Sequence, residues 1–147
     1  MNVLHISYHT SPLTSLGRND GGGMSTYVHE LCNALSKKNN VTVITSDNSK
    51  SDKKNYYHNL VFSKLDHNTE IKTKINNLDS FYKEFIDSQI NGGSIDIDVT
   101  HAHYWLSGIL AKKLKKDFGL PYVYSSHSFG LFVGMGKRNK FRIEQER

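Results

Sequence analysis

The loop that ends in three consecutive glycines carries the residues best suited to bind an anion. Gly21-Gly22-Gly23 stands immediately before Met24, where a helical spacing of apolar residues begins. Glycines leave backbone N–H groups uncovered, and the first turn of a helix presents the positive end of the helix dipole. This arrangement predicts a loop that holds a phosphate group.

Two other interpretations of these glycines remain to be weighed. A dinucleotide site would use Asp47 as the acid that binds the ribose, but it requires a tight turn with the spacing G-x-G-x-x-G. About a dozen residues separate the preceding apolar run from the glycines, and that spacing is absent. This argues against a dehydrogenase. The glycines could also form only a turn, as glycine clusters often do.

Three histidines follow two of the predicted strands. His101 and His103 are two residues apart, so they point to the same side of a strand, and His127 follows a later strand. Together they could form a three-histidine metal site. Histidines at strand ends more often hydrogen-bond the backbone or a ligand, so we expect no metal and no bound cofactor here.

Two aromatic residues come directly after the histidine pair. Tyr104 and Trp105 are suited either to the core or to a surface on which a sugar or a base stacks. The neighbouring Leu106 favours core packing for Trp105. For Tyr104 both interpretations stay open.

Alternating strand and helix patterns surround these residues. Short apolar or β-branched runs predict strands, at 2–8, 41–45, 60–65, 95–101 and 122–126. Apolar residues spaced three and four apart predict helices, at 24–38, 78–90 and 104–118. Residues 46–57 are expected to form a loop, and 66–74 receive no assignment. The alternation indicates an α/β fold, a Rossmann-like parallel sheet with helices on both faces.

In such a sheet the carboxyl ends of the strands share one edge, where ligands bind. The glycine loop follows the first strand, His101 and His103 follow the fourth, and His127 follows the fifth. We therefore expect these groups to converge on one site.

Composition limits the class of protein. The 147 residues suit one domain, and the net charge of +5 suits an anionic partner. No nucleic-acid motif accompanies the lysines, so no nucleic-acid partner is expected, and Lys72 and Lys74 are expected to be solvated. The single cysteine, Cys32, is expected to pack beside a helix face. Without a signal peptide or a long apolar span, a cytoplasmic location is the default.

Four segments taken together resemble the amino-terminal domain of family 4 retaining glycosyltransferases, which have the GT-B fold. The resemblance is nearest to the branch that contains sucrose-phosphate synthase, sucrose synthase and the mycothiol-pathway N-acetylglucosaminyltransferase. The matching segments are residues 9–13 (HTSPL), 20–28 (DGGGMSTYV), 101–108 (HAHYWLSG) and 127–130 (HSFG). Each motif is weak alone, but their order along the strand ends is specific.

The resemblance implies that this chain is the acceptor side of a two-domain transferase whose donor substrate is a nucleotide-sugar. It implies that Gly22 and Gly23 bind the donor diphosphate and that His127 lies against the transferred sugar, near the reacting centre. His103, Tyr104 and Trp105 would line the acceptor side. The family needs neither a metal nor a bound cofactor for this transfer.

The sequence departs from the family pattern in two places. An apolar insertion at 131–136 precedes Arg138 and Lys140, the basic residues expected to reach the acceptor, and it would also suit contact with a membrane surface or a partner. Residues 1–147 are also expected to stop before the last strands of the acceptor domain and before the donor domain. We therefore expect the 147 residues alone to be inactive. The alternative is a stand-alone module that binds sugar phosphates or other anions, or that pairs with a separately encoded donor domain.

Overall fold

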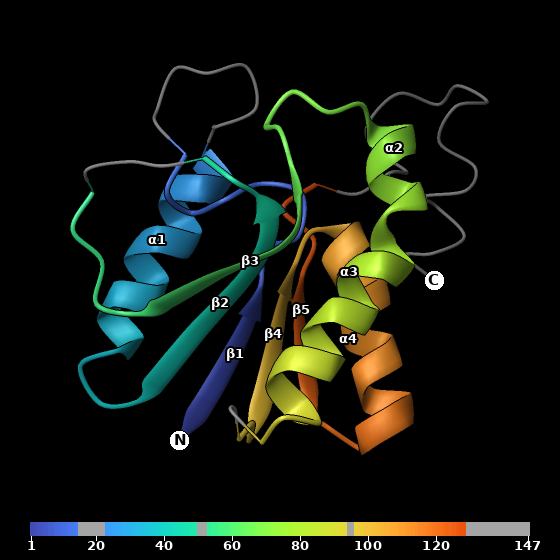
Figure 1. The fold of residues 1–147 in the computed structure, drawn as a ribbon. Coiled ribbons are helices and arrows are strands. Elements are labelled where there is room, and N and C mark those ends of the chain that lie inside the picture. Colours follow the sequence, from blue (N-terminus) through green and yellow to red (C-terminus); the bar gives the residue numbers. More distant parts are fainter. Residues whose placement is uncertain (15–22, 50–52, 94–95, 129–147) are drawn as a thin grey trace.

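The computed structural model describes residues 1–14, 23–49, 53–93 and 96–128, and it contains one sheet of five parallel strands in the order β3-β2-β1-β4-β5 (Figure 1). The strands are β1 (Asn2–Ile6), β2 (Asn40–Asp47), β3 (His58–Leu65), β4 (Val99–His103) and β5 (Tyr122–Ser125). From β1 the chain adds β2 and β3 on one side of the sheet and then β4 and β5 on the other. Ligands of such sheets bind at the carboxyl ends of the two strands where this change of direction occurs, here β1 and β4.

Helices cover both faces of this sheet (Figure 1). They are α1 (Gly23–Leu35), α2 (Ile71–Asn76), α3 (Leu78–Phe85) with the π-helical turn η1 (Ile86–Ile90), and α4 (Trp105–Phe118). α1 lies on one face, and α3 and α4 lie on the other. The Rossmann-like α/β fold predicted from the alternation is therefore confirmed.

The larger core lies between the sheet and α3 and α4. Phe81 and Phe85 of α3 meet Phe62 of β3 edge to face, with ring centroids 5.9 and 5.7 Å apart. Because side chains alternate along a strand, Leu4 and Ile6 of β1 both point into this core. The burial of each of these side chains contributes about 1.5–3 kcal/mol to the stability of the fold.

The smaller core lies between α1 and the opposite face. Val28 and Cys32 of α1 pack there with Val41 and Val43 of β2. Cys32 is fully buried, and burial raises the pKa of its thiol to about 12, so the predicted packing role is confirmed. Val3 belongs to the same face, and so does His5, two residues further along the strand.

The expected strands and helices are present, but β1 and α1 end earlier than expected, at Ile6 and Leu35, and β2 continues to Asp47 in the expected loop. Three further differences concern β4, η1 and α2. β4 begins at Val99 and not at residue 95, so His101 and His103 lie inside the strand and not after it. Asp98 and Asp96 instead bond Asn2, at 2.7 and 3.5 Å, at the amino end of the sheet. The predicted helix at 78–90 ends in η1, and the unassigned region contains α2.

Among the described residues, no helix combines the length and the apolar character needed to cross a bilayer.

Candidate functional site

The first turn of α1 and the ends of β4 and β5 meet at the carboxyl edge of the sheet. Nδ1 of His103 lies 3.1 Å from Nε2 of His127. The ring of Tyr27, the fifth residue of α1, stands edge-on to both, at centroid distances of 6.1 and 5.3 Å. The predicted meeting of His103 and His127 is therefore found, and α1, which begins at the last of the three glycines, lies beside them.

Gly23 leaves room for a ligand at the start of α1. A Cβ atom built at Gly23 would meet no atom of the described residues within 4 Å, and the first turn of the helix carries no acidic residue. A bound anion would therefore face open space and the positive end of the helix dipole. Gly22, predicted to bind the same group, lies outside the described residues.

A row of three imidazoles leads from the sheet to this edge. Nδ1 of His5 on β1 lies 2.9 Å from Nε2 of His103 on β4, which in turn bonds His127. His5 and His103 are fully buried, whereas His127 is exposed. His5 was not predicted from the sequence. Its signal was a lone polar residue in the first apolar run, although its partner is 98 positions away.

His101 stands beside this row. Its Nε2 atom lies 2.8 Å from Oγ of Ser125, and its ring lies 4.1 Å from that of His103. Potential ligand nitrogens of His5, His101 and His103 all lie within 4.8 Å of one another. This set differs from the three-histidine metal site considered from the sequence, because His5 takes the place of His127. The nitrogens of His5 and His103 point at each other and not at a common centre.

Burial favours the neutral form of all four imidazoles of this site. Burial, together with nearby His101, lowers the pKa of His5 to about 3, and burial with the neighbouring histidines lowers that of His103 to about 2. Burial also lowers the pKa of His101 and of His127. Each ring therefore offers one N–H donor and one acceptor nitrogen.

Two residues of the site have a backbone conformation that favours glycine. Tyr104 has φ 73° and ψ 158° at the start of α4, and His127 has φ 56°. The N–H of Tyr104 donates to the carbonyl of Ser125 at 2.9 Å, and its ring lies 4.2 Å from that of His9. Such strain costs about 1–3 kcal/mol and clusters at functional sites.

The remaining predicted acceptor residues fare differently. Trp105 is 5 % exposed and belongs to the larger core, so core packing, the favoured interpretation, is confirmed, and little of its surface is left for a ligand. Both ring nitrogens of His103 are engaged by other histidines, so a direct contact with the acceptor is no longer expected of it. Arg138 and Lys140 lie outside the described residues.

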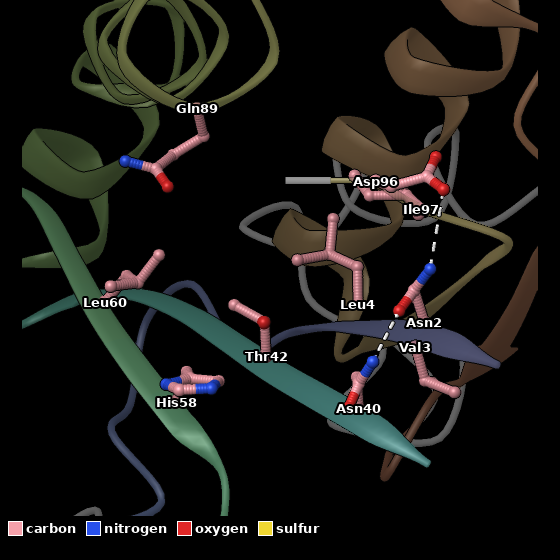
Figure 2. Close-up of a pocket in the computed structure, with 10 residues that line it drawn as sticks. All are labelled: Asn2, Val3, Leu4, Asn40, Thr42, His58, Leu60, Gln89, Asp96 and Ile97. Carbon is pink, nitrogen blue, oxygen red and sulfur yellow. Dashed lines mark hydrogen bonds between the residues drawn. The ribbon is translucent and has the colours of Figure 1, made fainter. Parts of the chain in front are cut away.

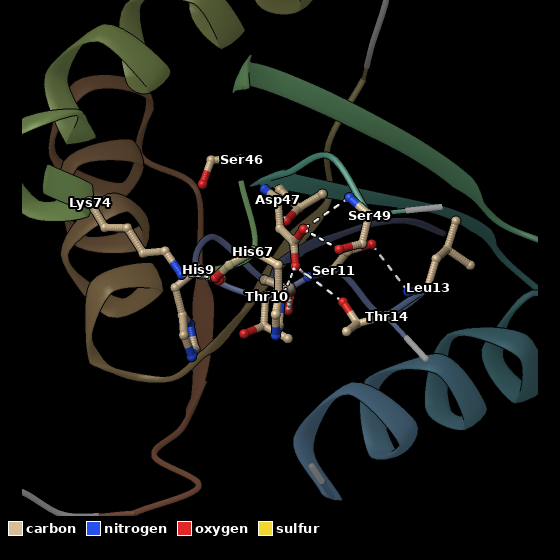
Figure 3. A network of polar contacts seen from close by, with 12 residues as sticks. His9, Thr10, Ser11, Leu13, Thr14, Ser46, Asp47, Ser49, His67 and Lys74 are labelled. Carbon is tan, nitrogen blue, oxygen red and sulfur yellow. Dashed lines mark hydrogen bonds and ion pairs between the residues drawn. The ribbon is translucent and has the colours of Figure 1, made fainter. Parts of the chain in front are cut away.

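A buried carboxylate anchors the loop that follows β1 (Figure 3). Asp47, at the end of β2, accepts hydrogen bonds from Ser11 N–H at 2.9 Å, Thr14 Oγ1 at 3.1 Å and His67 Nδ1 at 2.9 Å. Ser49 adds its N–H at 2.9 Å and its hydroxyl at 2.6 Å. Burial alone would raise the pKa of Asp47, but these hydrogen bonds hold it below the usual value. The carboxylate is thus occupied by its own chain, which further disfavours a ribose-binding role.

Lys74 joins α2 to the same loop (Figure 3). Its ammonium group donates to the carbonyls of His9 at 2.9 Å and His67 at 3.1 Å, and the side chain is only 5 % exposed. The expectation that Lys74 is solvated was wrong, because these carbonyls replace its water. The ring of His9 is buried, and burial, with the nearby Lys74 charge, lowers its pKa to about 3.

A pocket of about 460 Å³ lies at the opposite edge of the sheet (Figure 2). Asn2, Asn40 and His58, the first residues of β1, β2 and β3, line it together with Gln89 of η1. Because it lies at the amino ends of the strands, it is separate from the histidine cluster and from the start of α1.

Comparison with known proteins agrees with this geometry. The chain is 31 % identical over 144 residues to a D-inositol 3-phosphate glycosyltransferase of Thermobifida fusca, covering 90 % of this chain and 32 % of the relative. A protein of the same name from Pseudarthrobacter chlorophenolicus is 30 % identical over 136 residues, covering 86 % and 32 %. The chain thus spans about a third of the length of these curated relatives.

A solved structure shares the fold. Sucrose-phosphate synthase from Thermosynechococcus elongatus superposes with a TM-score of 0.79 over 99 % of this chain and 39 % of that chain, at 21 % identity. At this identity the likeness concerns the fold alone.

The family follows from the extent of a further match. The sequence model of Glycosyltransferase Family 4 covers residues 21–147. This range includes the start of α1, both histidine motifs and every strand of the sheet except β1. On this match the chain belongs to glycosyltransferase family 4.

Proposed function

We propose that this chain is the acceptor-side domain of a retaining glycosyltransferase. The reaction would transfer a hexosyl group from a nucleotide-sugar to a sugar, a sugar phosphate or a similar acceptor. One observation carries the proposal: the ring of Tyr27 stands 5.3 Å from that of His127, so the start of α1 lies beside the imidazole. A group that binds diphosphate and a group that contacts sugar would then be neighbours.

The donor diphosphate would bind at the start of α1. In this proposal the backbone N–H groups of Gly22 and Gly23 donate to phosphate oxygens, supported by the open space at Gly23. Fixed N–H dipoles of this kind stabilise the negative charge that grows on the leaving diphosphate. No metal ion or bound cofactor is part of the proposal.

His127 would contact the transferred sugar. Its exposed, neutral ring sits on a backbone of fixed, left-handed conformation at the end of β5. Retaining transfer in which the acceptor attacks on the face that the diphosphate leaves relies on positioning the two substrates and on stabilising charge. A rigidly held imidazole suits the first of these tasks.

The acceptor would lie on the Tyr104 side of the site. The half-buried ring of Tyr104 packs on His9, and its strained backbone marks the same edge of the sheet. The two relatives are named for D-inositol 3-phosphate, so a phosphorylated polyol is the acceptor class that we propose. Arg138 and Lys140 remain proposed partners for its phosphate.

Replacing Gly23 with alanine tests the diphosphate site. A methyl group there meets no other atom, and alanine has the higher helix propensity, so the midpoint of thermal unfolding should stay the same or rise slightly. The same methyl group would stand where the diphosphate approaches, so the affinity for a nucleotide-sugar should fall about tenfold or more. Isothermal titration of the intact protein measures this. Unchanged affinity would place the diphosphate elsewhere.

A thermal-shift screen of the intact gene product tests the function as a whole. Nucleotide-sugars and phosphorylated polyols should raise its unfolding midpoint, because a ligand that binds only the folded state stabilises it by mass action. The 147 residues alone should show no measurable transfer, since the proposed site needs a second wall for the donor. A shift with dinucleotides and with none of the nucleotide-sugars would contradict the proposal.

A further inference from the structure

We propose that His5 and His103 are positioning residues that hold His127 in a single tautomer, with its proton on Nδ1. His127 would then always offer an N–H donor to the ligand. The inference concerns three side chains from β1, β4 and the end of β5, and it goes beyond the contact between His127 and sugar that the proposed function contains.

The geometry of the row is that of consecutive hydrogen bonds. The rings of His5 and His103 are nearly parallel, at 9°, with centroids 5.2 Å apart and the facing nitrogens 2.9 Å apart. The facing nitrogens of His103 and His127 are 3.1 Å apart, with centroids at 5.3 Å. In both pairs the nitrogens lie between the rings, so each contact joins a donor nitrogen to an acceptor nitrogen.

The environment of His5, at the buried end of the row, indicates which nitrogen of each pair donates the hydrogen bond. Among the described residues, Nε2 of His5 is buried and has no hydrogen-bond partner. Buried backbone N–H groups without a partner are rarer than buried carbonyls without one, and we apply the same asymmetry to the two nitrogens of this ring. This favours His5 with its proton on Nδ1, from which it donates to Nε2 of His103.

The tautomer of His5 then fixes the donor and acceptor nitrogens of the next two rings. An accepting Nε2 leaves His103 with its proton on Nδ1, and that N–H donates to Nε2 of His127. His127 must in turn carry its proton on Nδ1. The step requires neutral rings, and burial favours them: it lowers the pKa of His5 to about 3 and that of His103 to about 2, and it also lowers the pKa of His127.

The groups around the three histidines do not compete for the nitrogens that make these two hydrogen bonds. His101 directs its Nε2 to Ser125 and not to the row. Tyr27 meets His103 and His127 through the edge of its ring. His127 bonds His103 through Nε2, and no described residue hydrogen-bonds its Nδ1. In our proposal the N–H of Nδ1 donates to the ligand, where it would select an acceptor oxygen such as that of a sugar hydroxyl.

Nitrogen NMR of the intact protein, labelled with ¹⁵N at histidine, reads these tautomers directly. Long-range correlations between ring protons and nitrogens should show His5, His103 and His127 each with a protonated Nδ1 and an unprotonated Nε2 at pH 7. A spectrum in which His127 or His103 carries its proton on Nε2, or exchanges between tautomers, would overturn the proposal. This reading needs no variant and no ligand.

Two substitutions at one position separate tautomer control from packing. His5→Leu removes the donor, so His103 and His127 should each exchange between tautomers. His5→Asn places an amide N–H near the position of Nδ1 and should restore the single tautomer. His58→Asn, at an exposed position on β3, is the matched control and should change none of the three signals. Signals of His103 and His127 that are the same in His5→Leu as in the wild type would also overturn the proposal.

The link to catalysis rests on the proposed function and has its own measurement. In the intact transferase, His5→Leu should lower kcat about tenfold, the worth of one hydrogen bond, and His5→Asn should recover most of it. If the wild type transfers no sugar at all, the proposed function fails while the tautomer assignment stands. If transfer is normal and His5→Leu leaves kcat unchanged, the positioning role fails and the function stands.

Discussion

Replacing Asp47 with alanine should lower the free energy of unfolding by about 3–5 kcal/mol. The carboxylate is 1 % exposed and accepts hydrogen bonds from Ser11, Thr14, Ser49 and His67. Its removal leaves several buried donors without an acceptor and releases the loop after β1 from β2. Urea denaturation of the two proteins, followed by circular dichroism, measures the difference.

Asp79→Ala is the matched control for this change. Asp79 is 89 % exposed and pairs with Lys113 at 2.6 Å, and such surface pairs contribute about 1 kcal/mol or less. A loss at Asp47 no larger than at Asp79 would show that the network does not hold the loop.

The same carboxylate makes stability depend on pH in one direction. Because the fold lowers the pKa of Asp47 below its ordinary value of 3.8, its contribution is fully present above that value. It is lost as the pH falls through the lower, folded-state pKa. The wild type should therefore lose more stability than Asp47→Asn between about pH 5 and pH 2. Parallel curves for the two proteins would contradict this.

Replacing His127 with alanine should lower kcat of the intact protein by about 10²–10³-fold, as is typical when a group that positions charge or substrate is removed. Binding of the nucleotide part of the donor should change much less, because α1 provides that contact in our proposal. Release of nucleotide in the presence of a phosphorylated polyol measures the rate.

Two further variants make this result interpretable. Alanine at a φ of 56° carries strain, so His127→Gly, which adopts this conformation freely, should lose activity equally. His58→Ala, at the opposite edge of the sheet, should keep normal activity. A His127→Ala protein within threefold of the wild-type kcat would remove His127 from the active site.

Most of the fold could be predicted because its elements carry strong periodicity. The β-branched run of β2 and the spacing of α3 need no tertiary information. α2 could not be found in this way, since it is short and depends on Lys74 and on the Tyr8 hydroxyl, which donates to the Lys74 carbonyl at 2.6 Å. The start of β4 was misplaced because Asp96 and Asp98 alternate with isoleucines like strand residues, although they bond Asn2 instead.

The site was predictable only where chain position decides it. His127 and the glycine loop follow strands, so a parallel sheet brings them to one edge. His5 and Asp47 gain their roles from partners that are distant in the sequence, 98 positions away for His5 and 36 for Ser11. A sequence pattern does not tell which residues of neighbouring strands and loops lie side by side, so neither network could be predicted.

The stereochemistry of sugar transfer tests the central claim most directly. The intact protein is incubated with α-linked UDP-, ADP- or GDP-sugars and a phosphorylated polyol, and ¹H NMR follows the anomeric proton of the product. We predict transfer from at least one donor with the α configuration retained. A β-configured product, or no transfer from any donor by a folded, intact protein, would contradict the account.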